Sequence, residues 1–280
     1  MNTKDVVWAL GSYDPEMRAI RYLLGKAGYR CAVANRYGRR CTSSNAYNAD
    51  DLSKPIKDGQ QIAWVECRSD RFNPDGDIIV DHHNPGDPGF DAPPSEFWEG
   101  SSIGQVSRII GVSNPESRLV AASDHCLSAA MRGECPGIDP SDLMSWRVMA
   151  RSAMAEIQPW LLRRMISRAV ERIDSLPRLD FGGVQIVDAS FDKTPELRDA
   201  AAVAHVPILT TRINAAGNIK IGLYGARPDV ISSWLEMMER SGLTEHTYGN
   251  PYREYAGALM TAEASHRLIA GYSTQSPTYF

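Results

Sequence analysis

The sequence predicts an α/β protein with a mostly parallel, doubly wound N-terminal sheet, a linker helix and a smaller α/β C-terminal domain. Short apolar runs alternate with segments of helical spacing through the first half, as they do when crossover helices join parallel strands. A long helical stretch then separates this half from a second group of strand-like runs. The chain of 280 residues is long enough for two domains with separate cores.

In the N-terminal half, apolar runs bounded by loop residues predict strands, and apolar residues at helical spacing predict helices. The expected strands are 5–10, 29–34, 61–66 and 78–80, and the expected helices are 16–27 and 101–111. Residues 119–122 form another short apolar run that ends at an acid and a histidine. We interpret this run as a further strand end.

Residues 142–173 are helical in pattern almost throughout, with a break at Pro159. Strand-like runs then return at 184–188, 207–211 and 219–224, a helix follows at 229–240, and residues 248–251 look like a turn. The expected domains are therefore a catalytic domain over 1–140, a helical linker over 141–178 and a second domain over 179–280.

Composition restricts the surroundings and the partners of the protein. The net charge is −4 and the isoelectric point about 5.9, so no basic field attracts long nucleic acid. The five cysteines form no Cys-x-x-Cys pair, and an odd count suits a reducing compartment. No apolar run reaches ~18 residues. We expect a cytoplasmic protein outside the membrane; a homodimer remains open.

The most informative stretch is Val80-Asp81-His82-His83-Asn84. In open α/β folds, ligands bind just beyond the carboxyl ends of buried strands. Neutral imidazole is a common metal ligand, and a neighbouring carboxylate can fix its tautomer. His82 is therefore the favoured ligand, against the alternative of a surface turn that happens to contain two histidines. Asp124 is favoured as a ligand over a capping role by the same context.

Two further acids follow expected strands. Glu66 and Glu16 are candidate ligands, although each could equally be a helix cap or a solvated loop residue. His125, Cys126 and Cys135 match no usual structural-zinc spacing, so we expect a buried thiol and a histidine that supports a ligand from behind.

These residues together resemble the DHH phosphoesterase superfamily. The similarity lies in Ile79–Asn84, in Ser101-Ser102 before a helix, in Asp124, and in Gly249-Asn250-Pro251 with Ala256-Gly257 near the end. It implies a metal-dependent catalytic domain and a smaller substrate-binding domain joined by a long helix. It also implies a role for each matching residue. The implied metal ligands are His82, Asp124, Glu66 and Glu16. His83 would bind substrate phosphate or support a ligand from behind, Asp81 would orient an imidazole, and Gly249, Asn250 and Gly257 would contact substrate.

Arg253 lies between Tyr252 and Tyr255 in the late loop and could hold a phosphate while a tyrosine stacks on a base. The alternative is an ordinary exposed loop, and the sequence favours neither.

The chain departs from the superfamily pattern in its first motif. Ser12 stands where the pattern has histidine, Glu16 stands for an aspartate, and Arg18 replaces the last acid. A cation at Arg18 opposes a second metal ion and could bind phosphate oxygens instead, or it is only a surface charge. Asp14 could substitute as a ligand if the register is shifted. We therefore expect one retained metal.

The functional expectation is a metal-dependent phosphoesterase that hydrolyses phosphate mono- or diesters of nucleotides or short oligonucleotides. The expected cofactor is Mn²⁺, with Mg²⁺ as the alternative, because oxygen ligands with one imidazole suit such ions. The competing hypothesis is a nucleotide- or phosphate-binding protein that kept the scaffold and lost catalysis. A third is a protein-interaction module with no ligand.

Overall fold

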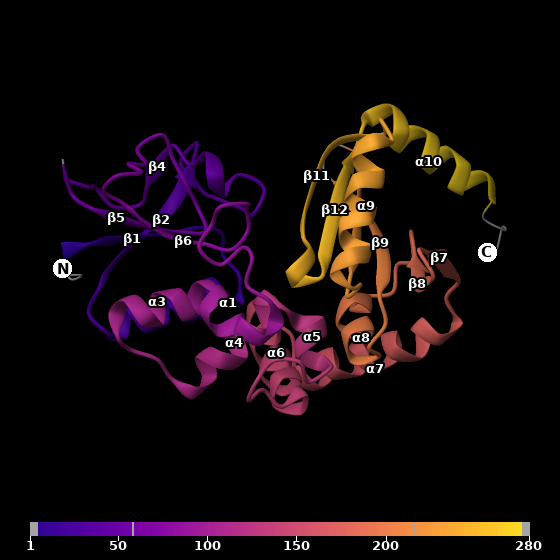
Figure 1. Ribbon diagram of the computed structural model, residues 1–280, viewed down its shortest axis with the longest axis horizontal. Helices are drawn as coiled ribbons and strands as arrows, with labels where there is room; N and C mark the ends of the chain where they lie inside the picture. Colours follow the sequence, from indigo (N-terminus) through magenta and orange to yellow (C-terminus); the bar gives the residue numbers. More distant parts are fainter. Residues whose placement is uncertain (1–4, 58, 215–216, 276–280) are drawn as a thin grey trace. The chain divides into compact units, whose positions relative to one another are not determined.

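The computed structural model of the protein describes residues 5–57, 59–214 and 217–275 (Figure 1). The fold is mixed α/β, as the sequence predicts. The chain divides into two compact units, Met1–Leu162 and Arg163–Phe280, and each contains its own sheet. The division falls inside helix α7 (Pro159–Ser175), a helix that begins at the proline where the sequence shows a break.

The sheet of the N-terminal unit is mostly parallel. Its strands are β1 (Val7–Leu10), β2 (Arg30–Arg36), β3 (Arg39–Arg40), β4 (Asp51–Leu52), β5 (Ile62–Val65) and β6 (Ile78–Val80). The spatial order is β3-β2-β1-β5-β6, with β4 also paired to β2, and only the pairs made by β3 and β4 are antiparallel. Every residue of β1 and β5 is buried, which explains why these strands appear in the sequence as continuous apolar runs.

Three of these strands end side by side. Leu10 pairs with Val65, and Val65 pairs with Val80. The residues that follow, Gly11, Glu66 and Asp81, therefore leave the sheet at one edge. A side chain at Gly11 would overlap the backbone carbonyl of Glu66, so glycine permits this close approach.

Helices α1 (Pro15–Lys26), α2 (Phe97–Gly100) and α3 (Ser102–Ile110) are followed by α4 (Pro115–His125), α5 (Leu127–Met131) and α6 (Pro140–Ala155). The helices α1, α3, α4 and α6 each start at a capping side chain that accepts a hydrogen bond from a backbone amide. The caps are Asp14, Ser101, Asn114 and Asp139. In three of the four, proline occupies the first turn, where no amide hydrogen is needed.

The strand expected at residues 119–122 is wrong. These residues lie inside α4, which begins at the Asn114 cap and the following Pro115. Their apolar run has no alternation because Val120, Ala121 and Ala122 are buried where α4 packs against other helices. Hydrophobic periodicity alone does not distinguish such a short buried segment of a helix from a buried strand.

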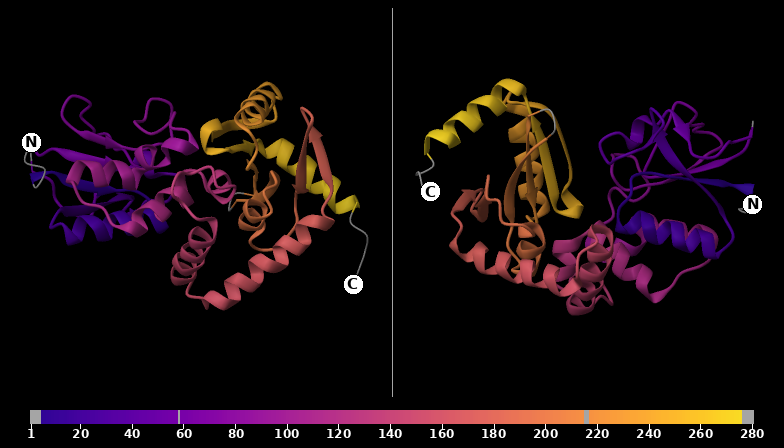
Figure 2. Two further views of the ribbon diagram at one scale, coloured as in Figure 1. Left: turned by 60° about the horizontal axis from the view of Figure 1, so that its bottom comes forward. Right: turned by 180° about the vertical axis from the view of Figure 1, so that it is seen from behind.

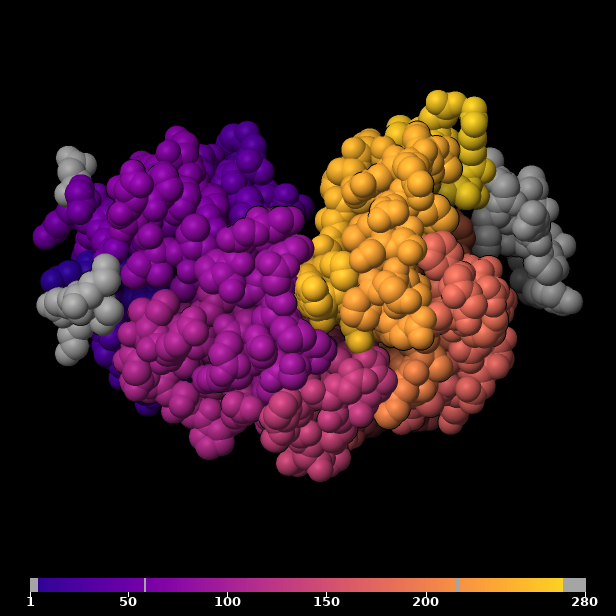
Figure 3. Space-filling model, in the orientation of Figure 1, coloured from indigo at the N-terminus to yellow at the C-terminus, as the bar shows by residue number. Residues whose placement is uncertain are grey.

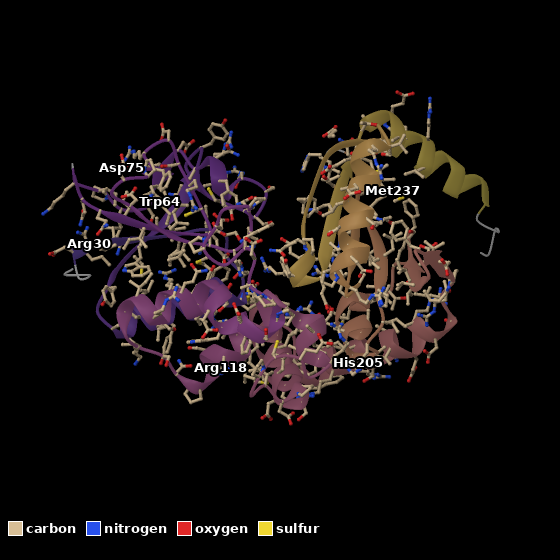
Figure 4. All side chains as sticks on the ribbon, viewed as in Figure 1. Arg30, Trp64, Asp75, Arg118, His205 and Met237 are labelled. Carbon is tan, nitrogen blue, oxygen red and sulfur yellow. The ribbon has the colours of Figure 1, made fainter. Side chains whose placement is uncertain are left out.

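The two faces of the first sheet are covered differently. Helices α1 and α3 lie on one side (Figure 1). On the other side, the segment containing Cys41, Ala46, Ala49 and Leu52 packs on alternate strand residues. Trp64 of β5, labelled in Figure 4, belongs to the hydrophobic core on this side of the sheet. Its indole nitrogen donates to Asp77 Oδ2 at 2.8 Å.

The second unit contains a sheet of the order β11-β12-β10-β9-β8-β7. Its strands are β7 (Arg178–Phe181), β8 (Val184–Ala189), β9 (Ile208–Ile213), β10 (Ile219–Tyr224), β11 (Thr244–Asn250) and β12 (Tyr255–Met260). Its other helices are α8 (Leu197–Val203), α9 (Pro228–Arg240) and α10 (Ala262–Gln275). Gly182 and Gly183, at φ 61° and 76°, make the tight turn between β7 and β8.

Helix α9 packs its apolar stripe, including Ile231 and Trp234, on one face of this sheet (Figures 1 and 2). Helices α7 and α8 form a second core with β8 and β9. Met237 on the outer side of α9 is 41% exposed, and α9 forms part of the surface drawn in Figure 3.

The turn expected at residues 248–251 is wrong for its first three residues. Tyr248, Gly249 and Asn250 complete β11, and the short 3-10 helix Pro251–Arg253 makes the turn. Gly257 of β12 pairs with Tyr248 of β11, and its missing side chain leaves room for the tyrosine ring. Among the residues described, no helix is long and apolar enough to cross a membrane.

Candidate metal centre

Four side chains from four separate elements converge in the N-terminal unit. Glu16 lies in the first turn of α1, Glu66 follows β5, His82 follows β6 and Asp124 lies in the last turn of α4. One ligand atom of each lies within 4.8 Å of the others. We call these four residues the ligand cluster. They are the four metal ligands implied by the superfamily resemblance.

One nitrogen of His82 faces all three carboxylates of the ligand cluster. His82 Nε2 is 3.2 Å from Asp124 Oδ2, 3.5 Å from Glu66 Oε1 and 3.9 Å from Glu16 Oε2. The Asp124 side chain is 32% exposed, so the cluster reaches solvent on that side. A cation placed among these atoms would have three carboxylates and one nitrogen around it.

The carboxylates of Glu16 and Glu66 are buried, with only 1% and 6% of each residue exposed. Glu16 Oε1 accepts a hydrogen bond from the Ile103 amide at 2.9 Å. Glu16 Oε2 and Glu66 Oε1 have no hydrogen-bond partner among the described residues. Burying such oxygens is costly unless a proton or a cation neutralises them. The ligand cluster therefore fits a divalent cation, and its geometry does not indicate which one.

Burial raises the pKa of Glu16 well above its ordinary value, and the charges of Asp124 and Glu66 raise it further. Burial also raises the pKa of Glu66, with Asp124 adding to the effect against an opposing contribution from His83. Asp14 lies close enough to be affected: burial, then Glu66 and Asp124, raise its pKa to about 8. The like charges of these acids disfavour their joint ionisation when no cation is present.

We expect the cation-free protein to lose stability as the pH rises. An acid with a raised pKa in the folded state stabilises the fold fully below its unfolded pKa of about 4, and this contribution disappears as the pH passes the folded pKa. For Asp14 that upper limit is about 8. Thermal unfolding in EDTA should therefore show a melting temperature that falls between about pH 5 and about pH 9.

Saturating Mn²⁺ or Zn²⁺ should reverse this trend, because ligands bind the metal in their deprotonated form. A melting temperature in EDTA that increased steadily over the same range would contradict the assignment of these carboxyl groups as neutral in the cation-free protein.

Asp81 does not join the ligand cluster; it orients the second histidine. Asp81 Oδ1 contacts His83 Nδ1 at 3.0 Å, and its two oxygens accept from Tyr47 Oη at 3.1 and 3.0 Å. Arg68 forms an ion pair with it at 3.5 Å. Burial alone would raise the pKa of Asp81, but the His83 hydrogen bond and the charges of His83, His82 and Arg68 outweigh it and lower the pKa. Asp81 is thus held as a carboxylate.

The backbone of Asp81 is fixed by Gln105 of α3. Gln105 Nε2 donates to the Asp81 carbonyl at 2.9 Å, and Gln105 Oε1 accepts from the Asp81 amide at 3.2 Å. Sequence reasoning missed Gln105, Tyr47 and Arg68. None of them lies near the histidine pair in sequence, and no local pattern marks them.

His83 forms a second group of potential ligands with Glu66 and His82. The two groups share Glu66 and His82, so they overlap instead of forming separate sites. The side chain of His83 is one-third exposed, which leaves it accessible to a substrate.

Two other charged residues of the first motif, Arg18 and Asp14, lie outside the ligand cluster. Arg18 is exposed and lines surface hollows with Tyr22 and Lys26. Two positions along a helix rotate a side chain by about 200°, so Arg18 lies on the opposite side of α1 from Glu16. The structure does not bring Arg18 to the ligand cluster. Asp14 caps α1, accepting from the Met17 amide at 2.7 Å.

The expected substrate residues of the second unit gather in one hairpin. Gly249 pairs with Ala256, and Asn250 accepts from the amides of Tyr252 and Arg253 at 2.9 and 3.3 Å. Arg253 is buried, and its guanidinium lies 5.3 Å from the centre of the Tyr255 ring. Arg253 is thus not part of an exposed loop. The Tyr248 ring packs against Gly257, where any side chain would overlap it.

Cys126 and Cys135 are buried with their sulfurs 3.1 Å apart, and none of the five cysteines, which all lie within the described residues, forms a disulfide. They join no group of metal-binding side chains among the described residues. His125, between Asp124 and Cys126, contacts His82.

No family model matches the chain, and no curated protein matches it at the significance required.

Proposed function

We propose that the protein is a metal-dependent phosphoesterase of the DHH type that hydrolyses phosphate mono- or diesters of nucleotides or short oligonucleotides in the cytoplasm. The ligand cluster is the observation that carries the proposal. Four residues from four elements meet around buried carboxylate oxygens that have no hydrogen-bond partner in the described structure. Its mixture of oxygen ligands and one imidazole favours Mn²⁺.

The proposed chemistry combines a cation at the ligand cluster with the neighbouring residue His83. A cation bound at the ligand cluster would supply a water of lowered pKa and neutralise charge on a phosphoryl group. His83 lies beside the cluster and is oriented by Asp81 through Nδ1. This orientation leaves the one-third exposed ring of His83 available to a non-bridging phosphate oxygen. His83 is therefore the proposed phosphate-binding and catalytic residue.

The second candidate is a nucleotide- or phosphate-binding protein that lacks turnover. It is favoured by the first motif, where Arg18 replaces an acid and the structure places it on the outer side of α1.

Metal analysis combined with hydrolysis distinguishes the two functions. Protein freed of metal with EDTA should hydrolyse bis(p-nitrophenyl) phosphate and a labelled dinucleotide only after Mn²⁺ is restored. Asp124→Ala should lower kcat/KM by more than about 100-fold while the protein stays folded. His205→Ala, at an exposed position of the second unit, serves as the control. Nucleotide binding without turnover under Mn²⁺, Mg²⁺, Co²⁺ or Zn²⁺ would establish the second candidate instead.

A further inference from the structure

A second buried histidine lies behind the ligand cluster. His125 Nδ1 is 3.0 Å from His82 Nδ1, the ring nitrogen of His82 that does not face the carboxylates. The other nitrogen of His125, Nε2, is 2.9 Å from the carbonyl oxygen of Ala92. Both histidines are buried. The contacts thus form a chain from a backbone carbonyl, through two imidazoles, to the ligand cluster.

The hydrogen-bond partners determine where the protons lie when both rings are neutral. A carbonyl oxygen only accepts, so His125 carries its proton on Nε2. Its Nδ1 is then an acceptor, and His82 must donate to it from its own Nδ1. This tautomer leaves a lone pair on His82 Nε2, the nitrogen that lies among the three carboxylates.

We propose that His125 is a positioning residue that fixes His82 in the tautomer able to bind a cation. The inference rests on the cation-binding part of the proposed function and not on hydrolysis. Metal-bound histidines usually donate their second N–H to a carboxylate, a carbonyl or water. Here an imidazole takes that place, and the Ala92 carbonyl in turn fixes the tautomer of this imidazole.

The surrounding backbone is shaped to hold the His125 ring. Gly100, the last residue of α2, lies directly against it: a Cβ built on Gly100 would be 2.8 Å from His125 Cε1 and 3.1 Å from His125 Nε2. The same atom would also overlap the side chain of Ala92. A larger residue at position 100 would therefore displace the ring from the carbonyl that sets its proton.

The direct test is the tautomer of each histidine in Zn²⁺-loaded protein. Long-range ¹H–¹⁵N spectra of ¹⁵N-histidine-labelled protein separate Nδ1–H from Nε2–H rings. The six histidines are assigned by single replacements. We expect His82 as Nδ1–H and His125 as Nε2–H. The opposite assignment of either ring would overturn the proposal.

Variants at position 125 add a thermodynamic readout. His125→Phe removes both ring nitrogens and should weaken Zn²⁺ binding by roughly 10–100-fold in calorimetry. His125→Gln keeps one acceptor and one donor, so it should stay within a few-fold of the wild type. His246→Gln, an exposed histidine in the second unit, is the matched control.

The outcomes separate this inference from the proposed function. Wild-type protein that bound no divalent cation would refute the metal centre itself. Wild-type binding with unchanged affinity in folded His125→Phe would refute only the role of His125. If His125→Phe does not fold, as judged by its melting in EDTA, the wild-type tautomers still decide the question.

Discussion

Replacing Glu16 by glutamine is expected to stabilise the cation-free protein at about pH 8 and to remove most of the stabilisation that a divalent cation provides. The substitution keeps the hydrogen bond from the Ile103 amide, because the amide oxygen of glutamine also accepts. It removes a buried carboxylate whose pKa is raised by burial and by Asp124 and Glu66. Stability and metal binding should therefore change in opposite directions.

The melting temperature of Glu16→Gln in EDTA at about pH 8 should lie above that of the wild type, because glutamine leaves no charge to bury beside Asp124 and Glu66. The increase in melting temperature that Mn²⁺ produces should largely disappear. Glu171→Gln, an exposed carboxylate on α7, should change neither quantity. A Glu16→Gln variant that bound Mn²⁺ as tightly as the wild type would remove Glu16 from the ligand cluster.

Gly104→Ala is expected to cause a larger loss of stability than other single-methyl changes in the helices of the first unit. A Cβ at Gly104 would overlap the backbone carbonyl of Trp98, which cannot move without displacing α2. Overpacking of this kind costs about 1–3 kcal/mol and occasionally more. Because α3 also supplies the Ile103 amide to Glu16 and the Gln105 side chain to Asp81, metal affinity should fall with stability.

Gly25→Ala is the matched control for this prediction. Gly25 also lies in a helix, but a Cβ there meets nothing within 4 Å. The substitution should stabilise the protein by about 0.5–1 kcal/mol, since alanine loses less backbone entropy than glycine. Chemical denaturation of both variants measures the contrast. Equal effects of the two substitutions would contradict the packing described for α2 and α3.

The fold class could be predicted because the central strands are buried on both faces. The runs that become β1 and β5 are continuously apolar because every residue in them is buried, and proline and capping residues mark the starts of the helices. The short strands β3, β4 and β7 could not be found in this way. Their residues are mostly exposed or polar, so they show no apolar period.

The ligand cluster could be anticipated only in part. Glu66 and His82 follow neighbouring parallel strands, and the strand register explains their proximity. The sequence predicts Asp124 at a strand end, but it comes from a helix, and its approach to His82 depends on how α4 packs against the rest of the unit. Tyr47 reaches Asp81 across 34 positions of sequence, a contact that only the tertiary structure reveals. Of the two interpretations of Arg18, the surface charge agrees with the structure, because the helical rotation after Glu16 directs Arg18 away from the cluster.

The backbone at Glu66 adopts a conformation that is unfavourable for folding. Glu66 has φ 50°, in the left-handed region that glycine and asparagine tolerate and other residues occupy at a cost of roughly 1–2 kcal/mol. Selection for folding alone would favour a small or amide residue at this strand end. A glutamate in this strained conformation is understandable if its carboxylate is required at the ligand cluster.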